Sequence, residues 1–228
     1  MTAWTYIRKN TCTSTNDVAK ALPPYSVIST CHQTNGRGRM GRVWEDAKGN
    51  LKASIVLPKP KKNAHLYTFL ISLAVAKTLS QLSPKIKWPN DILIDGKKVC
   101  GILLEATQNS LIIGIGINVV SVPKMNALYP VTCLKDCHFN TTDIKLLKSI
   151  LQNFDSVLEF YHKEGFKPVR HEWLSFACGL NKPISVNLPY RTIQGIFKGI
   201  SDIGALMLET KDAQMLTITA GDVFLIKN

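Results

Sequence analysis

The spacing of apolar residues changes twice along the chain, and this change limits the fold more than any other feature. In the first half, the apolar stretches are mostly short and rich in β-branched residues, which is typical of strands. Over residues 144–161 the apolar residues step by three and four, which predicts one amphipathic helix. Short alternating segments return after residue 178. We therefore expect an α+β domain over 1–178, with a mixed β-sheet flanked by helices, and a small C-terminal β domain over 179–228.

Turn residues and apolar runs predict the individual elements. Ser14 to Asp17 reads as the start of a first helix that Pro23 and Pro24 break. Strands are expected over 25–30, 51–57, 86–88, 91–94, 99–106 and 111–120, a buried helix over 66–82, and a shorter element after Pro168. Gly165 is expected to end the amphipathic helix. In the C-terminal part, the segments 184–188, 191–200, 204–210 and 215–219 predict strands that form a small barrel.

The composition favours a cytoplasmic protein without a membrane partner. With 45% apolar and 19% charged residues the chain can bury a sizeable core, yet no apolar run reaches about 18 residues. The first residues lack the apolar segment of a signal peptide. The 6 cysteines are scattered and predict reduced thiols. Cys133, Cys137 and His138 could hold a metal, but CxxxCH is not a zinc spacing, so no metal site made by the protein is predicted.

The net charge of +12 indicates an anionic partner without choosing one. Nucleic acid, a nucleotide polyphosphate and an acidic protein all remain open.

A glycine- and arginine-rich segment, Gly36 to Trp44, carries the first candidate site. Its letters satisfy GxGxxG, but no apolar helix follows and no acidic residue stands about 20 positions on, so a dinucleotide fingerprint is excluded. The glycines allow close approach of a ligand, and the arginines offer forked donors for a carboxylate or phosphate. A flexible basic loop that binds nucleic acid is the alternative. Because no acid lies within the loop, we expect residues 34–42 to be mobile until an anion binds.

Three further patches combine residues that packing alone rarely brings together. Residues 87–91 read KWPND, a mixture of cation, aromatic ring and turn formers. Lys97 and Lys98 lead into the apolar segment 99–105, where a lysine could meet an anion over a sheet or could equally be a solvated strand end. Glycines at 101, 114 and 116 weaken strand interiors and indicate close approach by a ligand or another backbone.

Taken together, these patches resemble the biotin protein ligase family. GRGRMGRVW, KWPND, GILLE and GIGIN occur in that order, with Ser-Thr-Asn at 14–16 as a fifth match. The resemblance implies a catalytic domain of the class II synthetase-like, biotin/lipoyl ligase type, and residues 179–228 resemble the family's SH3-like domain. It is weakest between Ser121 and Asn140.

The resemblance implies a two-step reaction. Biotin and ATP, with Mg²⁺ bound to the triphosphate, give biotinyl-5′-AMP, and biotin then passes to a lysine of a biotin carboxyl carrier domain. No tightly bound cofactor is implied. Because Ser14 stands so near the start, no winged helix and no operator DNA are expected, and the family includes monomers and homodimers. A lipoate or octanoate ligase of the same fold and a basic nucleic-acid-binding protein are the alternatives.

The resemblance also implies roles for individual residues. Catalysis is assigned to Lys98, which the KxxGILxE pattern selects over Lys97, together with Arg37 and Arg39. The residues implied for biotin are Ser14, Thr15, Gln33, Gly36, Arg37, Gly101 and Gly114. Those implied for ATP and the adenylate are Arg37, Arg39, Trp44, Asn90, Lys98 and Asn118. Met40 stands where some relatives carry another arginine.

Overall fold

A seven-stranded mixed sheet forms the centre of the computed structural model, which describes residues 2–122 and 130–226. Its strands, in spatial order, are β1 (Thr5–Cys12), β2 (Ser26–Gln33), β3 (Leu51–Pro58), β7 (Ser110–Ile117), β6 (Lys97–Ala106), β5 (Asp91–Ile94) and β4 (Lys85–Lys87). Only the β1–β2 pair is parallel among these ladders. The central strands β3 and β7 are buried along nearly their whole length, which the apolar sequence of β7 predicts, whereas β3 also buries Lys52 and Ser54.

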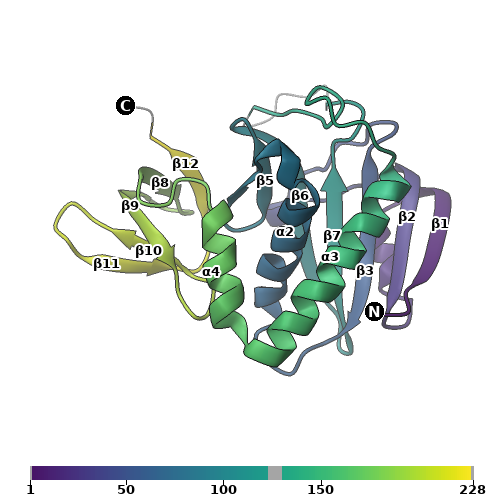
Figure 1. The fold of residues 1–228 in the computed structure, drawn as a ribbon, viewed down its shortest axis with the longest axis horizontal. Helices are drawn as coiled ribbons and strands as arrows, with labels where there is room; N and C mark the ends of the chain where they lie inside the picture. The colour runs from purple at the N-terminus through teal and green to yellow at the C-terminus, as the bar shows by residue number, and fades with distance from the viewer. Residues whose placement is uncertain (1, 123–129, 227–228) are drawn as a thin grey trace.

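Three helices cover one face of this sheet (Figure 1), and a fourth packs against Ile28, Val56 and Ile112 on the other face. The first group is α2 (Tyr67–Thr78), α3 (Asp143–Glu164) and α4 (Phe166–Phe176), and the fourth is α1 (Thr15–Ala19). The buried helix expected over 66–82 is α2, flanked by the 3₁₀ turns Ala64–Leu66 and Ser80–Leu82. It is apolar all round because it packs against the sheet, α3 and α4. Within the described residues, no helix is both long enough and apolar enough to span a bilayer.

The amphipathic helix forms as predicted. The Thr142 hydroxyl accepts the Lys145 N–H at 3.3 Å at its start, and Gly165, with φ of +79°, ends it. Its buried stripe is Leu146, Leu147, Ile150, Leu151, Phe154, Val157 and Leu158. Ile144, expected in the stripe, is 42% exposed and lies in the first turn of the helix.

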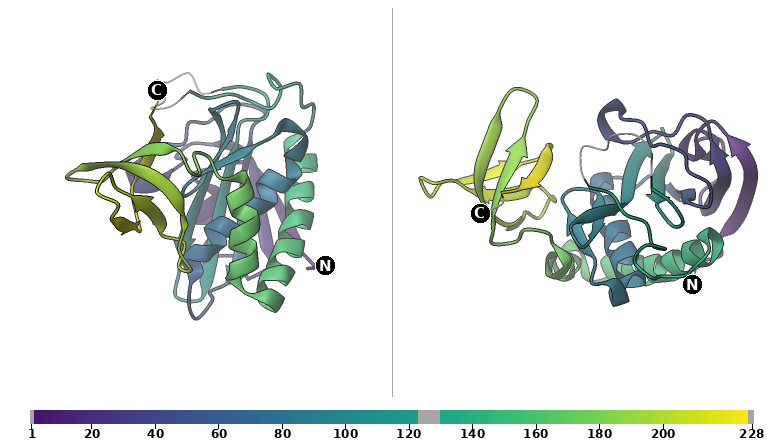
Figure 2. Two further views of the ribbon diagram at one scale, coloured as in Figure 1. Left: turned by 60° about the vertical axis from the view of Figure 1, so that its left-hand side comes forward. Right: turned by 90° about the horizontal axis from the view of Figure 1, so that it is seen from above.

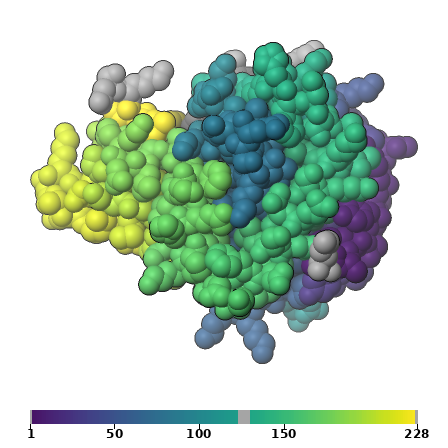
Figure 3. Space-filling view, in the orientation of Figure 1, coloured from purple at the N-terminus to yellow at the C-terminus, as the bar shows by residue number. Residues whose placement is uncertain are grey.

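The C-terminal part is a five-stranded antiparallel sheet that packs against the main domain (Figures 2 and 3). Its strands, in spatial order, are β11 (Met215–Ile218), β10 (Leu206–Glu209), β9 (Thr192–Ile200), β8 (Pro183–Asn187) and β12 (Asp222–Leu225). The indole N–H of Trp88 donates to the Gly204 carbonyl at 2.9 Å, and the two parts share one apolar core. At Gly204, whose φ is +73°, a Cβ would lie 2.4 Å from the Phe69 ring, so the contact requires glycine.

The main differences from the sequence-based expectation concern four elements. Strands β1 and β12 were not predicted, β2 continues three residues further to Gln33, and α4 begins before Pro168. Strand β1 is mostly exposed at the edge of the sheet, so its polar sequence lacks the apolar signal of a strand. Pro168 lies in the first turn of α4, where its missing N–H costs nothing.

Candidate functional site

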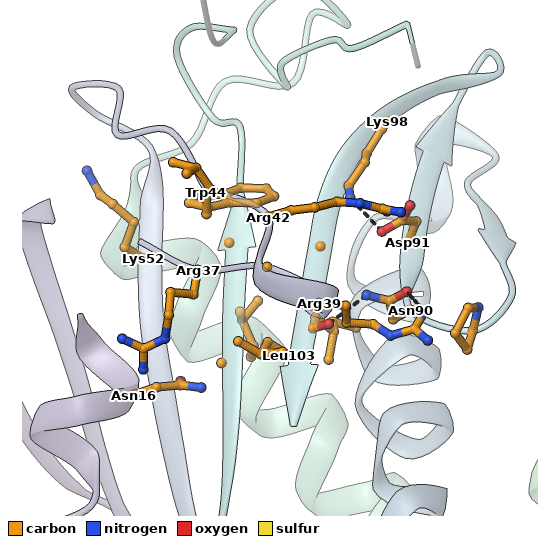
Figure 4. A pocket seen from close by; sticks show the side chains of 18 of the residues that line it. Asn16, Arg37, Arg39, Arg42, Trp44, Lys52, Asn90, Asp91, Lys98 and Leu103 are labelled. Carbon is orange, nitrogen blue, oxygen red and sulfur yellow. Dashed lines mark hydrogen bonds and ion pairs between the residues drawn. The ribbon is translucent and has the colours of Figure 1, made fainter. Parts of the chain in front are cut away.

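A pocket lies above the central strands and is closed from outside by the glycine- and arginine-rich loop, residues 36–44 (Figure 4). Its wall comes from the start of α1, this loop, the first residues of β3, the connection between β4 and β5, the glycines of β6 and β7, and β12. The predicted site residues that line it are Ser14, Thr15, Gln33, Arg37, Arg39, Trp44, Asn90, Lys98, Gly101 and Gly114.

One end of the pocket is lined by the uncharged hydrogen-bonding side chains of Thr15, Asn16 and Gln33. The Gln33 Oε1 accepts from the Thr15 N–H at 2.9 Å and lies 3.3 Å from the Thr15 hydroxyl. The Ser54 hydroxyl donates to Asn16 Oδ1 at 2.6 Å, and Asn16 Nδ2 donates to Glu105 Oε2 at 2.6 Å. Such amide and hydroxyl groups suit a small polar ligand with both N–H and C=O groups.

The floor of the pocket is made flat by glycines. The Trp44 indole lies over β6 and β7, where a Cβ on Gly116 would be 2.4 Å from Trp44 Cε2 and one on Gly101 would be 2.8 Å from Trp44 Cζ3. A Cβ on Gly114 would lie 2.5 Å from Asn16 Oδ1. Side chains at these positions would therefore displace Trp44 on one side and Asn16 on the other.

The opposite end of the pocket is strongly cationic. Lys98 Nζ lies 2.6 Å from Asp91 Oδ1 and 5.7 Å from the centre of the Trp44 ring. Lys87 Nζ lies 3.6 Å from the other oxygen of the same carboxylate. Burial lowers the pKa of Lys87, and the charge of Lys98 adds to this, while Asp91 and Asp222 oppose it. Two lysines thus share one aspartate.

The Arg37 side chain turns away from the pocket centre and forms a two-pronged ion pair with Asp17. Both of its terminal nitrogens lie 2.7 Å from Asp17 oxygens, and Glu105 is 3.6 Å away. The hydrogen bond from Arg37 holds the pKa of Asp17 well below its usual range.

The other two arginines of the loop bind residues far away in the sequence. Arg39 Nη1 donates to Asn90 Oδ1 at 3.1 Å, and Arg42 pairs with both carboxylate oxygens of Asp222 on β12. The loop contains no acid, as noted from the sequence, but acids and an amide elsewhere hold its arginines. These three contacts can hold the loop over the pocket, and the expected mobility of residues 34–42 stays a prediction.

The closed loop leaves little room inside. The free volume of the pocket is about 130 Å³. Pockets that enclose drug-sized ligands usually measure about 300 Å³ or more. In this conformation the pocket therefore has less free volume than a ligand of that size usually occupies.

Two predicted residues lie beside the pocket rather than in its wall. Gly36 packs behind Trp44, whose N–H donates to the Gly36 carbonyl at 2.9 Å. Asn118 is buried and donates to the Thr132 carbonyl at 3.1 Å. Met40, at the tip of the loop with φ of +55°, is 67% exposed and does not line the pocket.

Part of the segment that matched the family least, Ser121 to Asn140, supports the site. Residues 123–129 lie outside the described part of the chain. Beyond them, the Lys98 N–H donates to the Pro130 carbonyl at 2.8 Å, and the Thr132 N–H donates to the Lys98 carbonyl at 2.9 Å. The segment therefore fixes the backbone of Lys98 as well as the side chain of Asn118.

The residues that sequence reasoning did not assign are mostly the counter-charges. They are Asn16, Asp17, Arg42, Lys52, Lys87, Asp91 and Asp222. Asn16, Arg42, Lys87 and Asp91 lie within the matched motifs and could have been found there. Asp17 and Asp222 carry no motif signal, because their role depends on the tertiary fold.

All 6 cysteines are free thiols. Among residues 2–122 and 130–226, no group of three or more histidine, cysteine, aspartate or glutamate side chains is arranged to hold a metal ion. In the pocket, the carboxylates of Asp91 and Asp222 are already paired with basic side chains.

Comparison with known proteins identifies the family. A model of the biotin/lipoate A/B protein ligase family matches residues 5–120, and a model of the biotin protein ligase C-terminal domain matches residues 179–226. The chain is 36% identical over 209 residues to the bifunctional ligase/repressor BirA of Bacillus subtilis. This match covers 83% of the present chain but only 63% of the length of that relative.

Two further relatives match along nearly their whole length. The biotin–[acetyl-CoA-carboxylase] ligase of Paracoccus denitrificans is 32% identical over 236 residues, covering 92% of this chain and 96% of that protein. The structure of the biotin protein ligase from Aquifex aeolicus in complex with biotin and ATP matches with a TM-score of 0.87 and 26% identity, covering 98% of this chain and 99% of that one. The chain belongs to the biotin/lipoate A/B protein ligase family.

Proposed function

We propose that this protein is a biotin protein ligase, which forms biotinyl-5′-AMP from biotin and ATP and transfers the biotinyl group to a lysine of a carrier protein. The observation that carries the proposal is the polarity of one pocket. Its neutral end holds Thr15, Asn16 and Gln33, and its cationic end holds Lys98 and Arg39. A ureido ring fits the first end, and the carboxylate and triphosphate of the reactants fit the second. The biotin and ATP bound to the Aquifex aeolicus relative support this assignment.

The first step brings two anions together, so charge neutralisation is the main requirement for catalysis. We assign Lys98 to the space between the biotin carboxylate and the α-phosphate. Its ammonium must leave Asp91 to reach them, and Lys87 would then remain as a counter-ion of that carboxylate. The site can therefore release Lys98 to a substrate without leaving a buried carboxylate unpaired.

Trp44 and the closed loop would serve the nucleotide. The indole offers a flat face to an adenine ring, and Arg37 and Arg39 would contact the phosphate or carboxylate once the loop reopens and closes again. Closure keeps water from the mixed anhydride, which hydrolyses readily. Asn118, whose side chain donates to the Thr132 carbonyl, would form the back wall of the adenylate subsite. Mg²⁺ would arrive with ATP as part of the substrate, held by phosphate oxygens and water, because the nearby carboxylates Asp91 and Asp222 are already paired.

A second cavity offers a route for the acceptor lysine. It lies between the KWPN segment and residues 203–205 of the C-terminal sheet, has a volume of about 390 Å³, and shares Arg39 and Asn90 with the pocket. Its wall is mostly apolar, including Phe69, Leu103 and Leu104, which suits the methylene arm of a lysine. The net charge of +12 would attract an acidic carrier domain.

The neutral end of the pocket argues against lipoate and octanoate as substrates. An apolar ring or alkyl chain would leave Thr15, Asn16 and Gln33 without ligand partners. The six free thiols favour a reducing compartment, and we propose the cytoplasm.

The test is pyrophosphate release by the purified protein with ATP, Mg²⁺ and one added acid. Release that depends on biotin, and that lipoate and octanoate do not support, is expected. Transfer is then followed as mass gain on a carrier domain and on the same domain with its acceptor lysine replaced by arginine. Pyrophosphate release with lipoate or octanoate but not with biotin would contradict the proposal and indicate a lipoate or octanoate ligase instead.

A further inference from the structure

Lys52 is a fully buried lysine on the central strand β3, with 1% of its side chain exposed. Its ammonium has three oxygen partners: the Cys31 carbonyl at 2.7 Å, Asp46 Oδ1 at 2.6 Å and the Ala47 carbonyl at 3.2 Å. Its aliphatic stem lines the pocket, and its nitrogen points away from the pocket centre (Figure 4). The ammonium is therefore committed to the protein and does not serve as a substrate ligand.

The partner carboxylate joins two walls of the pocket. Asp46 Oδ1 also accepts the Gln33 N–H at 3.2 Å, and its other oxygen faces His32 Nδ1. Gln33 in turn receives the Thr15 N–H at the neutral end. Asp46 follows Trp44 by two residues, so the same carboxylate fixes the segment that carries the indole.

The pair also holds the segment that leaves the loop against the sheet. Lys52 lies opposite Gly116 in the register of β3 and β7, and Gly116 is the glycine over which the Trp44 indole lies. Burial alone would raise the pKa of Asp46, but hydrogen bonds from Lys52, the Gln33 N–H and His32 outweigh it and lower that pKa. The carboxylate is thus held charged, with donors on both oxygens.

Packing does not explain this pair. Its neighbours along β3 are apolar or small, and replacing a buried ion pair by apolar residues often leaves stability equal or higher. A pair of this kind can instead select one geometry among several compact ones.

We propose that Lys52 and Asp46 form a positioning pair, which holds Gln33 and Trp44 at a fixed separation so that one ligand can contact both. The pair touches no reacting atom. Its loss should therefore weaken binding at both ends of the pocket and leave the rate of the chemical step nearly unchanged.

The test compares four variants with the parental protein: Lys52→Met, Asp46→Asn, the double variant, and the control Lys77→Met. The control removes an ion pair with an equal N–O distance of 2.6 Å, between Lys77 and Glu172, that lies outside the pocket. In each single variant of the buried pair, one polar partner stays buried without its counter-charge and the melting temperature is expected to fall, whereas the double variant leaves no unpaired charge. The readouts are the melting temperature, the KM values for biotin and ATP, and kcat for pyrophosphate release.

The double variant is expected to melt near the parental temperature and to show KM values for biotin and ATP that are both raised about tenfold, equivalent to about 1.4 kcal/mol each. Its kcat should stay close to the parental value, and Lys77→Met should leave both KM values unchanged. Parental KM values in the double variant would overturn the proposal, as would a fall in kcat at constant KM.

The inference rests on the proposed function, and a second readout separates the two. Hydrogen–deuterium exchange of peptides covering residues 33–50 needs no turnover. Faster exchange in the double variant than in Lys77→Met supports the pair, and equal exchange contradicts it. Absence of biotin-dependent pyrophosphate release from the parental protein would contradict the proposed function instead.

Discussion

Replacing Gly116 by alanine should weaken ATP binding while leaving biotin binding almost unchanged. The new Cβ would lie 2.4 Å from Trp44 Cε2, 2.5 Å from Cζ2 and 2.9 Å from Nε1. Carbon atoms prefer separations of about 3.5–4.0 Å, so the indole must move by roughly 1 Å or tilt away from the sheet. Its face would then no longer lie parallel to an adenine ring bound against it.

The size of the effect follows from the stacking contact that is lost. Stacking of a base on an aromatic side chain contributes about 1–3 kcal/mol. Since 1.4 kcal/mol corresponds to a factor of ten, the dissociation constant for ATP should rise about 5- to 150-fold. The neutral end, with Thr15 and Gln33, lies away from this displacement and should bind biotin as before.

Two other glycines serve as matched controls. A Cβ on Gly114 would lie 2.5 Å from Asn16 Oδ1, so Gly114→Ala should weaken biotin binding and spare ATP. A Cβ on Gly38 would meet its nearest atom, the Arg42 carbonyl oxygen, at an ordinary 3.6 Å, so Gly38→Ala should change neither. Calorimetric titration of each variant with biotin and with ATP measures both constants.

If biotin and ATP bind at separate ends of the pocket, Gly116→Ala and Gly114→Ala must weaken different ligands. If Gly116→Ala bound ATP like the parental protein, the indole would not be the adenine platform. If Gly116→Ala and Gly114→Ala weakened both ligands alike, the two ends of the pocket would not be separate subsites.

Three more results are expected. Lys98→Ala should lower the adenylation rate at least about a hundredfold, roughly 3 kcal/mol, if Lys98 is the cation that neutralises the two reacting anions as we propose. Replacing the exposed Lys97 by alanine should change pyrophosphate release little, and equal losses in the two variants would contradict the role proposed for Lys98. The kcat/KM for transfer to the carrier domain should fall steeply with added salt if charge steers the encounter, and a salt-independent value would show that it does not. Asp17→Asn breaks the ion pair that holds Arg37, so trypsin should cut after Arg37 sooner than in the parental protein, and an unchanged cutting rate would mean that this pair does not hold the loop closed.

Most of the fold could be read from the sequence, because the long apolar runs belong to elements that are buried. Strand β1 escaped because it is polar and lies at the edge of the sheet, where exposure imposes no pattern. The motif residues meet at one pocket as expected, with Gly36 and Asn118 just behind its wall.

What could not be read are the partners of the charged residues. A lysine in β3 suggests a solvated strand end, yet β3 is a central strand, so Lys52 is buried and requires acceptors from other segments. Likewise, no local rule relates Arg42 to Asp222. Such pairings depend on which segments the completed fold brings together, and the spacing of residues along the sequence does not predict them.

The three contacts that hold the loop have a consequence for the order of folding. Arg37, Arg39 and Arg42 find their partners 20, 51 and 180 positions away along the chain. Contacts between distant segments form late, because the intervening chain must first lose its freedom. The seven-stranded sheet can therefore assemble before the glycine- and arginine-rich loop is fully held. The contact between Arg42 and Asp222 forms only when β12 joins the C-terminal sheet. Under the proposed function, the chain would gain the ability to hold biotinyl-5′-AMP away from water only at the end of folding.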